Sequence, residues 1–394
     1  MINRRHFMEL GASLSVAWYS PTSFALGRAQ DPRLALLILR GGMDGLAAVP
    51  AFGDADYHRR RGDLAVAEPG REGGAFDLDG LFGLHGSLGN LHELYRAKQL
   101  AIVHAVASPY TGRSHFAGQD VLESGDPDPS GSSTGWLYRA LTTIPGDRQA
   151  DEVAMAFGPS IPMVLRGAKP VGAWSPDRLP EPDDDTMSRV LALYADDEVL
   201  GPKLRSMLKT EALVPAMDRA PRRNALSTLV KTAARMLKSE VGPRIAVFDA
   251  GGWDTHANQG SSTGQLAARF AALDAAIAEF KMGLGETWQQ TVLMVVTEFG
   301  RTVAPNGTRG TDHGVASVAF VMGGAINRGQ VLGEWPGLRR DALYEGRDLR
   351  QTTDLRAVFK SVLIGHLGAD AQAVDEVVFP VSLLEPIDGL LRTS

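Results

Sequence analysis

Polar side chains that could bind a metal ion stand in short segments directly after apolar runs. Asp254 and His256 are two residues apart, so in an extended segment both side chains lie on one side and can bind the same ion. Asp312 and His313 are adjacent in a glycine-flanked turn that could offer two ligands. For the first pair, the alternative is that Asp254 caps the next helix and His256 lies at the surface. For the second pair, the alternative is an ordinary polar turn.

Three further residues could take part in the same chemistry. Asp44, between glycines, is either a ligand or a turn aspartate. Glu298, after an apolar run, is either a ligand or the ion-pair partner of Arg301. His115 could be a ligand, a base for the neighbouring Ser114, or a packed loop histidine. The sequence leaves these alternatives open.

Ser114 is the candidate nucleophile. A serine hydroxyl attacks poorly unless a base or a metal lowers its pKa, and His115 or a bound ion could do so. The flanking Arg113 could hold an anionic oxygen. Ser114 could also cap a helix that begins near Phe116, and the two roles are compatible, because a helix N-terminus attracts an anion.

The remaining histidines are given no catalytic role. His58, His85 and His92 are interpreted as surface or packing residues, His104 as a hydrogen-bonded core residue, and His366 as packing in an apolar helix. The chain has no cysteine, so a metal must be held by Asp, Glu, His or hydroxyl oxygen.

The elements that must position these residues alternate short apolar runs with helical patterns. This is typical of an α/β fold with a mostly parallel central sheet and helices on both faces. Strands are predicted at Leu34–Leu39, Leu100–Val106, Val153–Phe157, Arg244–Asp249, Val292–Thr297 and Ser317–Met322. Helices are predicted at Leu88–Lys98, Arg223–Glu240, Gly264–Gly283 and Leu355–Leu367. Since ligands bind at the carboxyl ends of such strands, the candidate residues are expected to meet at one edge of the sheet.

Two stretches are predicted to be irregular. Gly125 to Gly135 is rich in Gly, Asp, Pro and Ser and should form an ordered loop or a flap. Trp174 to Asp185 is rich in Pro and Asp and introduces a predicted helical insertion at Thr186–Leu213. We therefore expect a single domain over residues 31–394, with an insertion near 174–222 that could form a cap.

The N-terminus has the pattern of a twin-arginine export signal. Arg4 and Arg5 precede a short apolar stretch, Leu10 to Ala17, and then small residues near a plausible cleavage zone. Residues up to about Gln30 are excluded from the fold. The pattern predicts a periplasmic or extracellular protein that uses the twin-arginine translocase as its partner during export.

The composition is that of an ordinary globular protein. Apolar residues make up 44% of the chain and the net charge is −6. No basic patch suggests binding to nucleic acid, and no later apolar run is long enough to form a stable membrane span.

Five motifs in this order resemble a family catalogued as domain of unknown function 1501. Its members resemble the alkaline phosphatase and sulfatase superfamily in fold, and many carry twin-arginine signals. The motifs are Leu39-Arg40-Gly41-Gly42-Met43-Asp44-Gly45-Leu46, Arg113-Ser114-His115-Phe116-Ala117-Gly118-Gln119-Asp120, Gly252-Trp253-Asp254-Thr255-His256, Thr297-Glu298-Phe299-Gly300-Arg301-Thr302 and Gly310-Thr311-Asp312-His313-Gly314.

The resemblance implies an alkaline-phosphatase-like site. Asp44 would be an early ligand and Ser114 the nucleophile, while Asp254 with His256 and Asp312 with His313 would each serve one of two divalent ions. The sequence departs from the superfamily pattern in two places. One residue separates the first pair where three are usual, and the only late histidine, His366, lies in an apolar helix.

These observations predict an exported metal-dependent hydrolase of a small anionic phosphate or sulfate ester. Ser114 would attack, and Arg113 or Arg301 would hold a non-bridging oxygen. The ion would be zinc, manganese, calcium or magnesium. The alternative is a non-catalytic exported protein that keeps the fold for binding or assembly, with or without one structural metal. A redox enzyme is disfavoured, because the chain has neither cysteine for a cluster nor a dinucleotide fingerprint.

Overall fold

Six apolar runs form the centre of one large sheet, as predicted. The computed structural model describes residues 31–146, 150–176, 197, 201 and 225–392. The predicted export signal lies outside these residues, and so does the predicted helical insertion at Thr186–Leu213 apart from residues 197 and 201. The six strands are β1 (Arg33–Leu39), β4 (Leu100–Ala107), β5 (Ala154–Phe157), β7 (Ile245–Ala250), β8 (Thr291–Thr297) and β9 (Ser317–Gly323). All residues of β1, β4, β8 and β9 are buried, which explains why these runs show no alternation.

Strand direction brings distant loops to one edge of the sheet. The order is β10-β4-β9-β8-β1-β7-β5-β6, with β11 also paired to β4. The neighbours pair in parallel except β9, which is antiparallel to both β4 and β8. The residues that precede β9 therefore lie at the same edge as those that follow β4, β8, β1 and β7.

The short strands were not predicted from the sequence. They are β6 (Gly172–Trp174), β10 (Gln330–Leu332), β11 (Thr353–Asp354) and the hairpin of β2 (Phe76–Asp77) with β3 (Gly83–Leu84). Two or three residues are too few to show a strand pattern.

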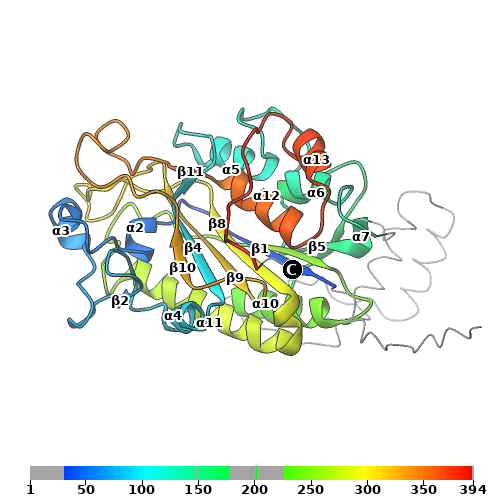
Figure 1. Ribbon diagram of the computed structural model, residues 1–394, viewed down its shortest axis with the longest axis horizontal. Helices are drawn as coiled ribbons and strands as arrows, with labels where there is room; N and C mark the ends of the chain where they lie inside the picture. The colour runs from blue at the N-terminus through cyan, green and yellow to red at the C-terminus, as the bar shows by residue number, and fades with distance from the viewer. Residues whose placement is uncertain (1–30, 147–149, 177–196, 198–200, 202–224, 393–394) are drawn as a thin grey trace, which may run out of the picture. The chain divides into compact units, whose positions relative to one another are not determined.

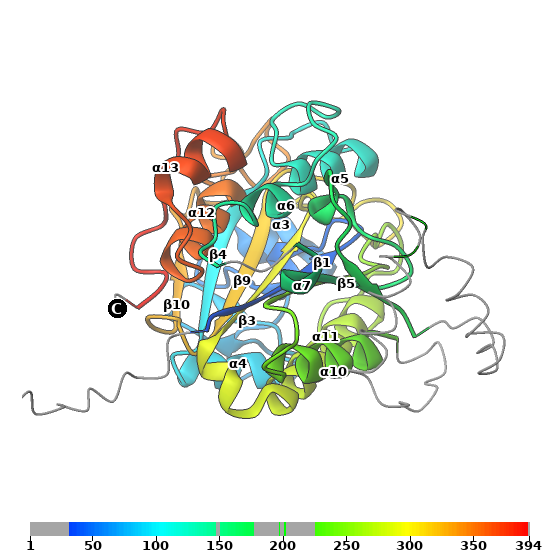
Figure 2. The same ribbon diagram turned by 90° about the vertical axis from the view of Figure 1, so that its right-hand side faces the viewer.

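Helices cover both faces of the sheet (Figure 1, Figure 2). The four predicted helices are present as α4 (Gly89–Arg96), α10 (Ala225–Lys238), α11 (Gln265–Leu284) and α12 (Leu355–Gly365). Helices α4, α10 and α11 lie on one face, and α12 lies on the other with α5 (His115–Ser124) and α6 (Trp136–Ala140). A separate apolar core fills the space on each side of the sheet.

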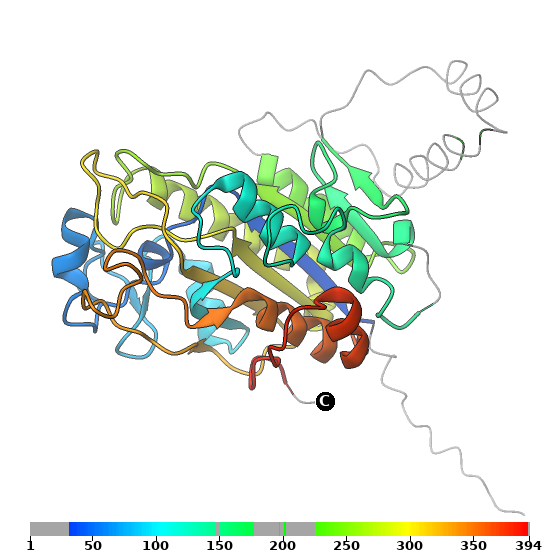
Figure 3. The ribbon, with the colours of Figure 1, turned by 90° about the horizontal axis from the view of Figure 1, so that it is seen from above.

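Figure 3 shows the same ribbon from above, with the sheet between the helices of its two faces. The described residues from Pro32 onwards belong to one compact unit. Among the described residues, no helix combines the length and apolarity needed to cross a membrane.

His104 is a core residue, as predicted. It is 2% exposed, its Nε2 lies 3.0 Å from the carbonyl oxygen of Val49, and its Nδ1 accepts a hydrogen bond from the backbone N–H of Ala105. Burial lowers the pKa of His104 to about 4, so the folded protein keeps this ring neutral at neutral pH.

Acid should therefore destabilise the fold through His104. The unfolded chain binds a proton at this histidine near pH ~6.5, above the folded pKa, so stability is complete above that pH and is lost as the pH falls towards 4. We expect a loss of about 3 kcal/mol from this group. Urea unfolding between pH 7 and pH 4 should give a flatter stability profile for His104→Gln than for the wild type. His58→Gln, at an exposed site, should leave the profile unchanged, and parallel profiles for wild type and His104→Gln would contradict the assignment.

Candidate metal centre

The predicted ligands meet at the edge of the sheet where the polar loops converge. Asp254 and His256 follow β7, His313 precedes β9, and His115 begins α5 after β4. His115, Asp254 and His313 each offer a ligand atom, and these atoms all lie within 4.8 Å of one another. Strand direction, not nearness in sequence, assembles this group.

The Asp254 carboxylate is the centre of the cluster. Its Oδ1 lies 3.0 Å from Nε2 of His256 and 3.1 Å from Nε2 of His313, and its Oδ2 lies 3.4 Å from Nε2 of His115. The Nε2 atoms of His256 and His313 are 2.9 Å apart. Ligands bound to one ion at ~2.0–2.2 Å lie roughly 3–3.5 Å from one another, so the spacing fits a shared ion.

The hydrogen bonds of the three histidines turn the same nitrogen towards the centre. Nδ1 of His115 lies 2.8 Å from Glu298 Oε1, Nδ1 of His256 lies 3.2 Å from Asp312 Oδ1, and Nδ1 of His313 lies 2.8 Å from the carbonyl oxygen of Arg113. Each of these acceptors can hold a proton on Nδ1, and a neutral ring in that tautomer would carry its lone pair on Nε2. Metal-binding histidines are oriented in this way.

In that tautomer the Nε2 lone pairs and the Asp254 carboxylate would repel one another, and a bound cation would remove the repulsion. The buried Nε2 of His115 has no hydrogen-bond partner among the described residues. Nitrogen and oxygen donors of this kind suit a divalent ion, and these residues therefore fit one.

Arg301 fixes the charge and the orientation of Asp254. Burial alone would raise the pKa of Asp254, but the hydrogen bond and charge of Arg301, followed by the contact with His313 and the charge of His256, lower it to about 2. Arg301 is 2% exposed, and its other donors bind backbone carbonyls, including those of Gly42 and Thr311. This arrangement assigns Arg301 to the positioning of Asp254, whereas the sequence prediction was a clamp on the substrate.

Glu298 supports His115. It is fully buried, and Oε1 accepts hydrogen bonds from the backbone N–H of Gly41 and from Gln119 as well as from His115. Its Oε2 accepts from the Thr297 hydroxyl. Neither sequence interpretation, a metal ligand or the partner of Arg301, describes these contacts.

Asp44 does not join the cluster. Its Oδ2 accepts hydrogen bonds from Arg61 at 2.6 Å and Gln259 at 2.7 Å, and its Oδ1 caps the short helix α2 (Gly45–Ala48). Gln259 in turn accepts hydrogen bonds from Thr255 and Thr311, the neighbours of Asp254 and Asp312. Asp44 therefore contacts the loops that contain Asp254 and Asp312 indirectly, through Gln259.

Ser114 directly precedes the histidine of the cluster that begins α5. It is exposed and occupies the N-cap of α5, but its side chain makes no capping hydrogen bond. The neighbouring Arg113 offers its carbonyl to His313, while its guanidinium binds Asp348 and Glu345 instead of pointing to a substrate. The Ser114 side chain is therefore not used to cap the helix. Arg113 was predicted to hold an oxygen of the substrate, but its guanidinium is already bound to two carboxylates.

Close backbone contacts explain two of the motif glycines. Gly41 has φ +123°, and a Cβ there would lie 2.5 Å from the backbone nitrogen of Asp254. A Cβ on Gly310 would lie 2.3 Å from the backbone carbonyl carbon of His256. A side chain at either position would displace a ligand loop.

Two contributors to the site were missed in the sequence. Gln259 and Asp348 are both fully buried, and their side chains bind Asp44 and Arg113, respectively. Neither stands in a motif or after a predicted strand, so no local signal could have identified them.

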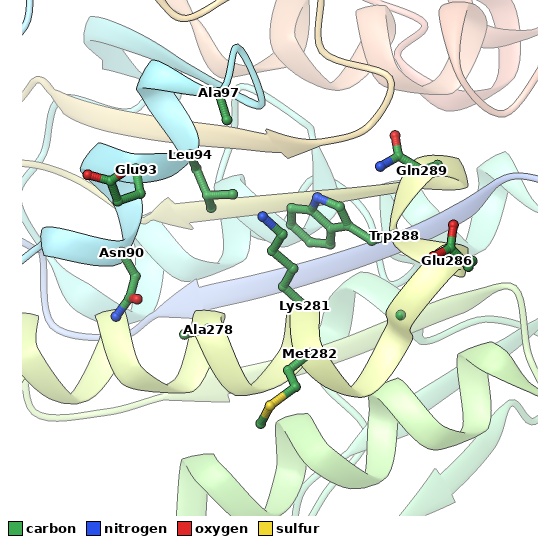
Figure 4. A pocket seen from close by; sticks show the side chains of 11 residues that line it. Asn90, Glu93, Leu94, Ala97, Ala278, Lys281, Met282, Glu286, Trp288 and Gln289 are labelled. Carbon is green, nitrogen blue, oxygen red and sulfur yellow. The ribbon is translucent and has the colours of Figure 1, made fainter.

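A separate groove of ≈ 590 Å³ lies between α4, α11 and the turn η4 (Gly285–Gln290) (Figure 4). Its lining includes Leu94, Lys281 and Trp288. Because η4 directly precedes β8, the groove lies at the amino end of that strand, whereas Glu298 follows its carboxyl end. The groove is therefore not part of the metal centre.

Several solved structures resemble the chain at low identity. A PsFucS1 sulfatase from Pseudoalteromonas sp. is 14% identical with a TM-score of 0.42, covering 92% of this chain and 73% of that one. The phosphonate monoester hydrolase of Agrobacterium radiobacter is 13% identical with a TM-score of 0.37, covering 86% and 74%. The C-terminal periplasmic domain of EcEptC from Escherichia coli, in complex with Zn, is 10% identical with a TM-score of 0.36, covering 74% and 72%. Likenesses at this level do not assign an activity.

No curated protein matches the chain. A family model described as "Protein of unknown function (DUF1501)" matches residues 31–378, and the chain therefore belongs to this family.

Proposed function

We propose that the protein is an exported metal-dependent hydrolase of a phosphate or sulfate ester, with Ser114 as its nucleophile. One observation carries the proposal: the Nε2 atoms of three histidines, His115, His256 and His313, lie within 3.4 Å of the Asp254 carboxylate, and the serine before His115 makes no side-chain capping hydrogen bond. Three nitrogens and a carboxylate favour a transition ion such as zinc or manganese over calcium or magnesium.

The chain supplies nucleophile, orientation and charge. A bound ion would act as a Lewis acid that lowers the pKa of the serine hydroxyl and neutralises developing charge. Ser114 Oγ gives its proton to water and attacks the phosphorus or sulfur atom, the bond from that atom to the alcohol oxygen breaks, and the alcohol oxygen takes up a proton from water. A second water molecule then attacks the phosphorus or sulfur atom of the seryl ester, which releases phosphate or sulfate and returns a proton to the serine oxygen. The contact of Glu298 with Nδ1 leaves Nε2 of His115 free, which suits a ligand and a base alike. We assign His115 as a ligand because its Nε2 lies 3.4 Å from Asp254 Oδ2, within the group of ligand atoms that it forms with Asp254 and His313.

The direct test is a metal titration followed by an ester screen. Purified protein lacking residues 1–30 is stripped with chelator, loaded with zinc, manganese, calcium or magnesium, and assayed with phosphomonoesters, phosphodiesters and sulfate esters. We expect a metal-dependent rise in the melting temperature and turnover of at least one ester class. Metal binding without turnover of any ester would support a non-catalytic binding or assembly protein instead.

Removal of a ligand should abolish tight metal binding. We expect His115→Ala and His256→Ala each to weaken zinc binding by more than about 100-fold, beyond the 10–100-fold typical of residues that only orient a ligand. His58→Ala is the matched control, because His58 is exposed and pairs only loosely with Glu68 at 3.7 Å. Competition with a chromophoric chelator measures the affinities, and unchanged binding in both ligand variants would rule out this ligand set.

A further inference from the structure

A turn that no motif includes holds the two sides of the metal centre together. The turn is residues 344–348, and its backbone pairs with Thr302 through Asp348. Asp348 is fully buried, and its Oδ2 accepts a hydrogen bond from Nε of Arg113 at 2.9 Å. The preceding residue, Arg347, donates from Nη2 to the carbonyl oxygen of His313 at 2.7 Å. One turn thus contacts the loop after β4 and the loop before β9.

The backbone of Arg113 shows why such a contact is needed. Arg113 has φ +61°, a left-handed conformation that a non-glycine residue adopts only when its surroundings hold it there. That conformation accompanies the 2.8 Å contact of its carbonyl oxygen with Nδ1 of His313. The next two residues are the nucleophile Ser114 and the ligand His115.

We infer that Asp348 is a positioning residue of the metal centre, acting through Arg113. Its carboxylate holds the Arg113 guanidinium, which keeps the Arg113 carbonyl against His313 and so keeps the lone pair of His313 on Nε2. The same contact sets Ser114 next to the ligands. This inference rests on the metal site of the proposed function and adds to it the residue that joins nucleophile and ligand.

The contacts of Arg113 supply a matched control. Its guanidinium binds two carboxylates, the fully buried Asp348 and Glu345, whose side chain is 57% exposed. An exposed ion pair contributes little, whereas a buried one holds geometry. Glu345→Gln therefore removes the same type of contact from the same arginine without removing the buried anchor.

The test is metal affinity in a double-mutant cycle. We expect Asp348→Asn and Arg113→Met each to weaken cobalt or zinc binding by about 10–100-fold, and Glu345→Gln by at most about five-fold. If Asp348 acts through Arg113, the double variant should bind metal about as well as either single variant, since the second change removes nothing further. The visible spectrum of the cobalt-loaded protein should change in Asp348→Asn, because the orientation of one ligand changes.

The outcomes separate this inference from the proposed function. Unfolding of the metal-free variants is measured in parallel. If Asp348→Asn folds poorly, the affinity of Arg113→Met, compared with that of Glu345→Gln, tests the same contact by itself. Wild-type affinity in folded Asp348→Asn, or losses that multiply in the double variant, would overturn the positioning role while the metal site stands. A wild-type protein that binds no metal would overturn the proposed function, and this inference with it.

Discussion

Replacing Ser114 with alanine is expected to lower kcat of the metal-loaded protein by at least about 10³-fold, while metal affinity stays unchanged. The serine supplies the oxygen that forms the covalent ester, and alanine has no atom that can do so. Its hydroxyl neither caps α5 nor coincides with any ligand atom of the cluster, so the change should leave the fold and the metal site intact. The measurement is steady-state turnover of whichever ester the wild type hydrolyses, with metal content determined on the same samples.

Ser227→Ala is the matched control for this experiment. The Ser227 hydroxyl donates a hydrogen bond to the Glu279 carboxylate, and these two residues lie in α10 and α11. Neither residue belongs to the loops that form the metal centre. We expect its kcat to equal that of the wild type. Full turnover in Ser114→Ala would exclude the serine as nucleophile, even if the metal centre proves correct.

The sequence predicts the sheet well because its strands are buried on both faces. Runs such as Leu34–Leu39 and Val292–Thr297 are continuous apolar segments of strand length, and the structure forms strands there. The antiparallel direction of β9 was not predicted, since it depends on how the chain crosses the sheet and not on the composition of the strand. That direction is what brings His313 to the edge where β7 ends.

The roles of the site residues depend on contacts that sequence spacing does not reveal. The sequence left His115 open between ligand, base and packing, and the ligand interpretation comes from its closeness to Asp254 and His313, which are 139 and 198 residues away. Asp254 and His256 were predicted as a pair because their separation of two residues suits one ion, a local property. Asp44 lies in a motif that suggests a metal ligand, but its carboxylate forms an ion pair with the buried Arg61. Nothing near Arg61 in the sequence indicates this ion pair.

Asp44→Asn is expected to lower the free energy of unfolding by about 3–5 kcal/mol. The Arg61 side chain is fully buried, its Nε has no hydrogen-bond partner among the described residues, and Asp44 is its carboxylate partner at 2.6 Å. Asparagine keeps the size of the side chain but leaves that guanidinium as an uncompensated charge in the interior. Urea unfolding of the metal-free protein measures the change, and Asp56→Asn, whose partner Arg59 is 71% exposed, should cost at most about 1 kcal/mol.

A second change distinguishes an ion-pair role of Asp44 from a ligand role. Adding Arg61→Met removes the stranded charge, so the double variant should recover much of the lost stability, because an apolar replacement of a buried pair is often close to neutral. The double variant should also bind zinc, although less tightly than the wild type, since Gln259 loses the Asp44 carboxylate while keeping its bonds to Thr255 and Thr311. If Asp44 were a ligand instead, Asp44→Asn would fold with wild-type stability and lose the metal, and Arg61→Met would not restore it. The buried ion pair thus accounts for the aspartate of the first motif without a second ion.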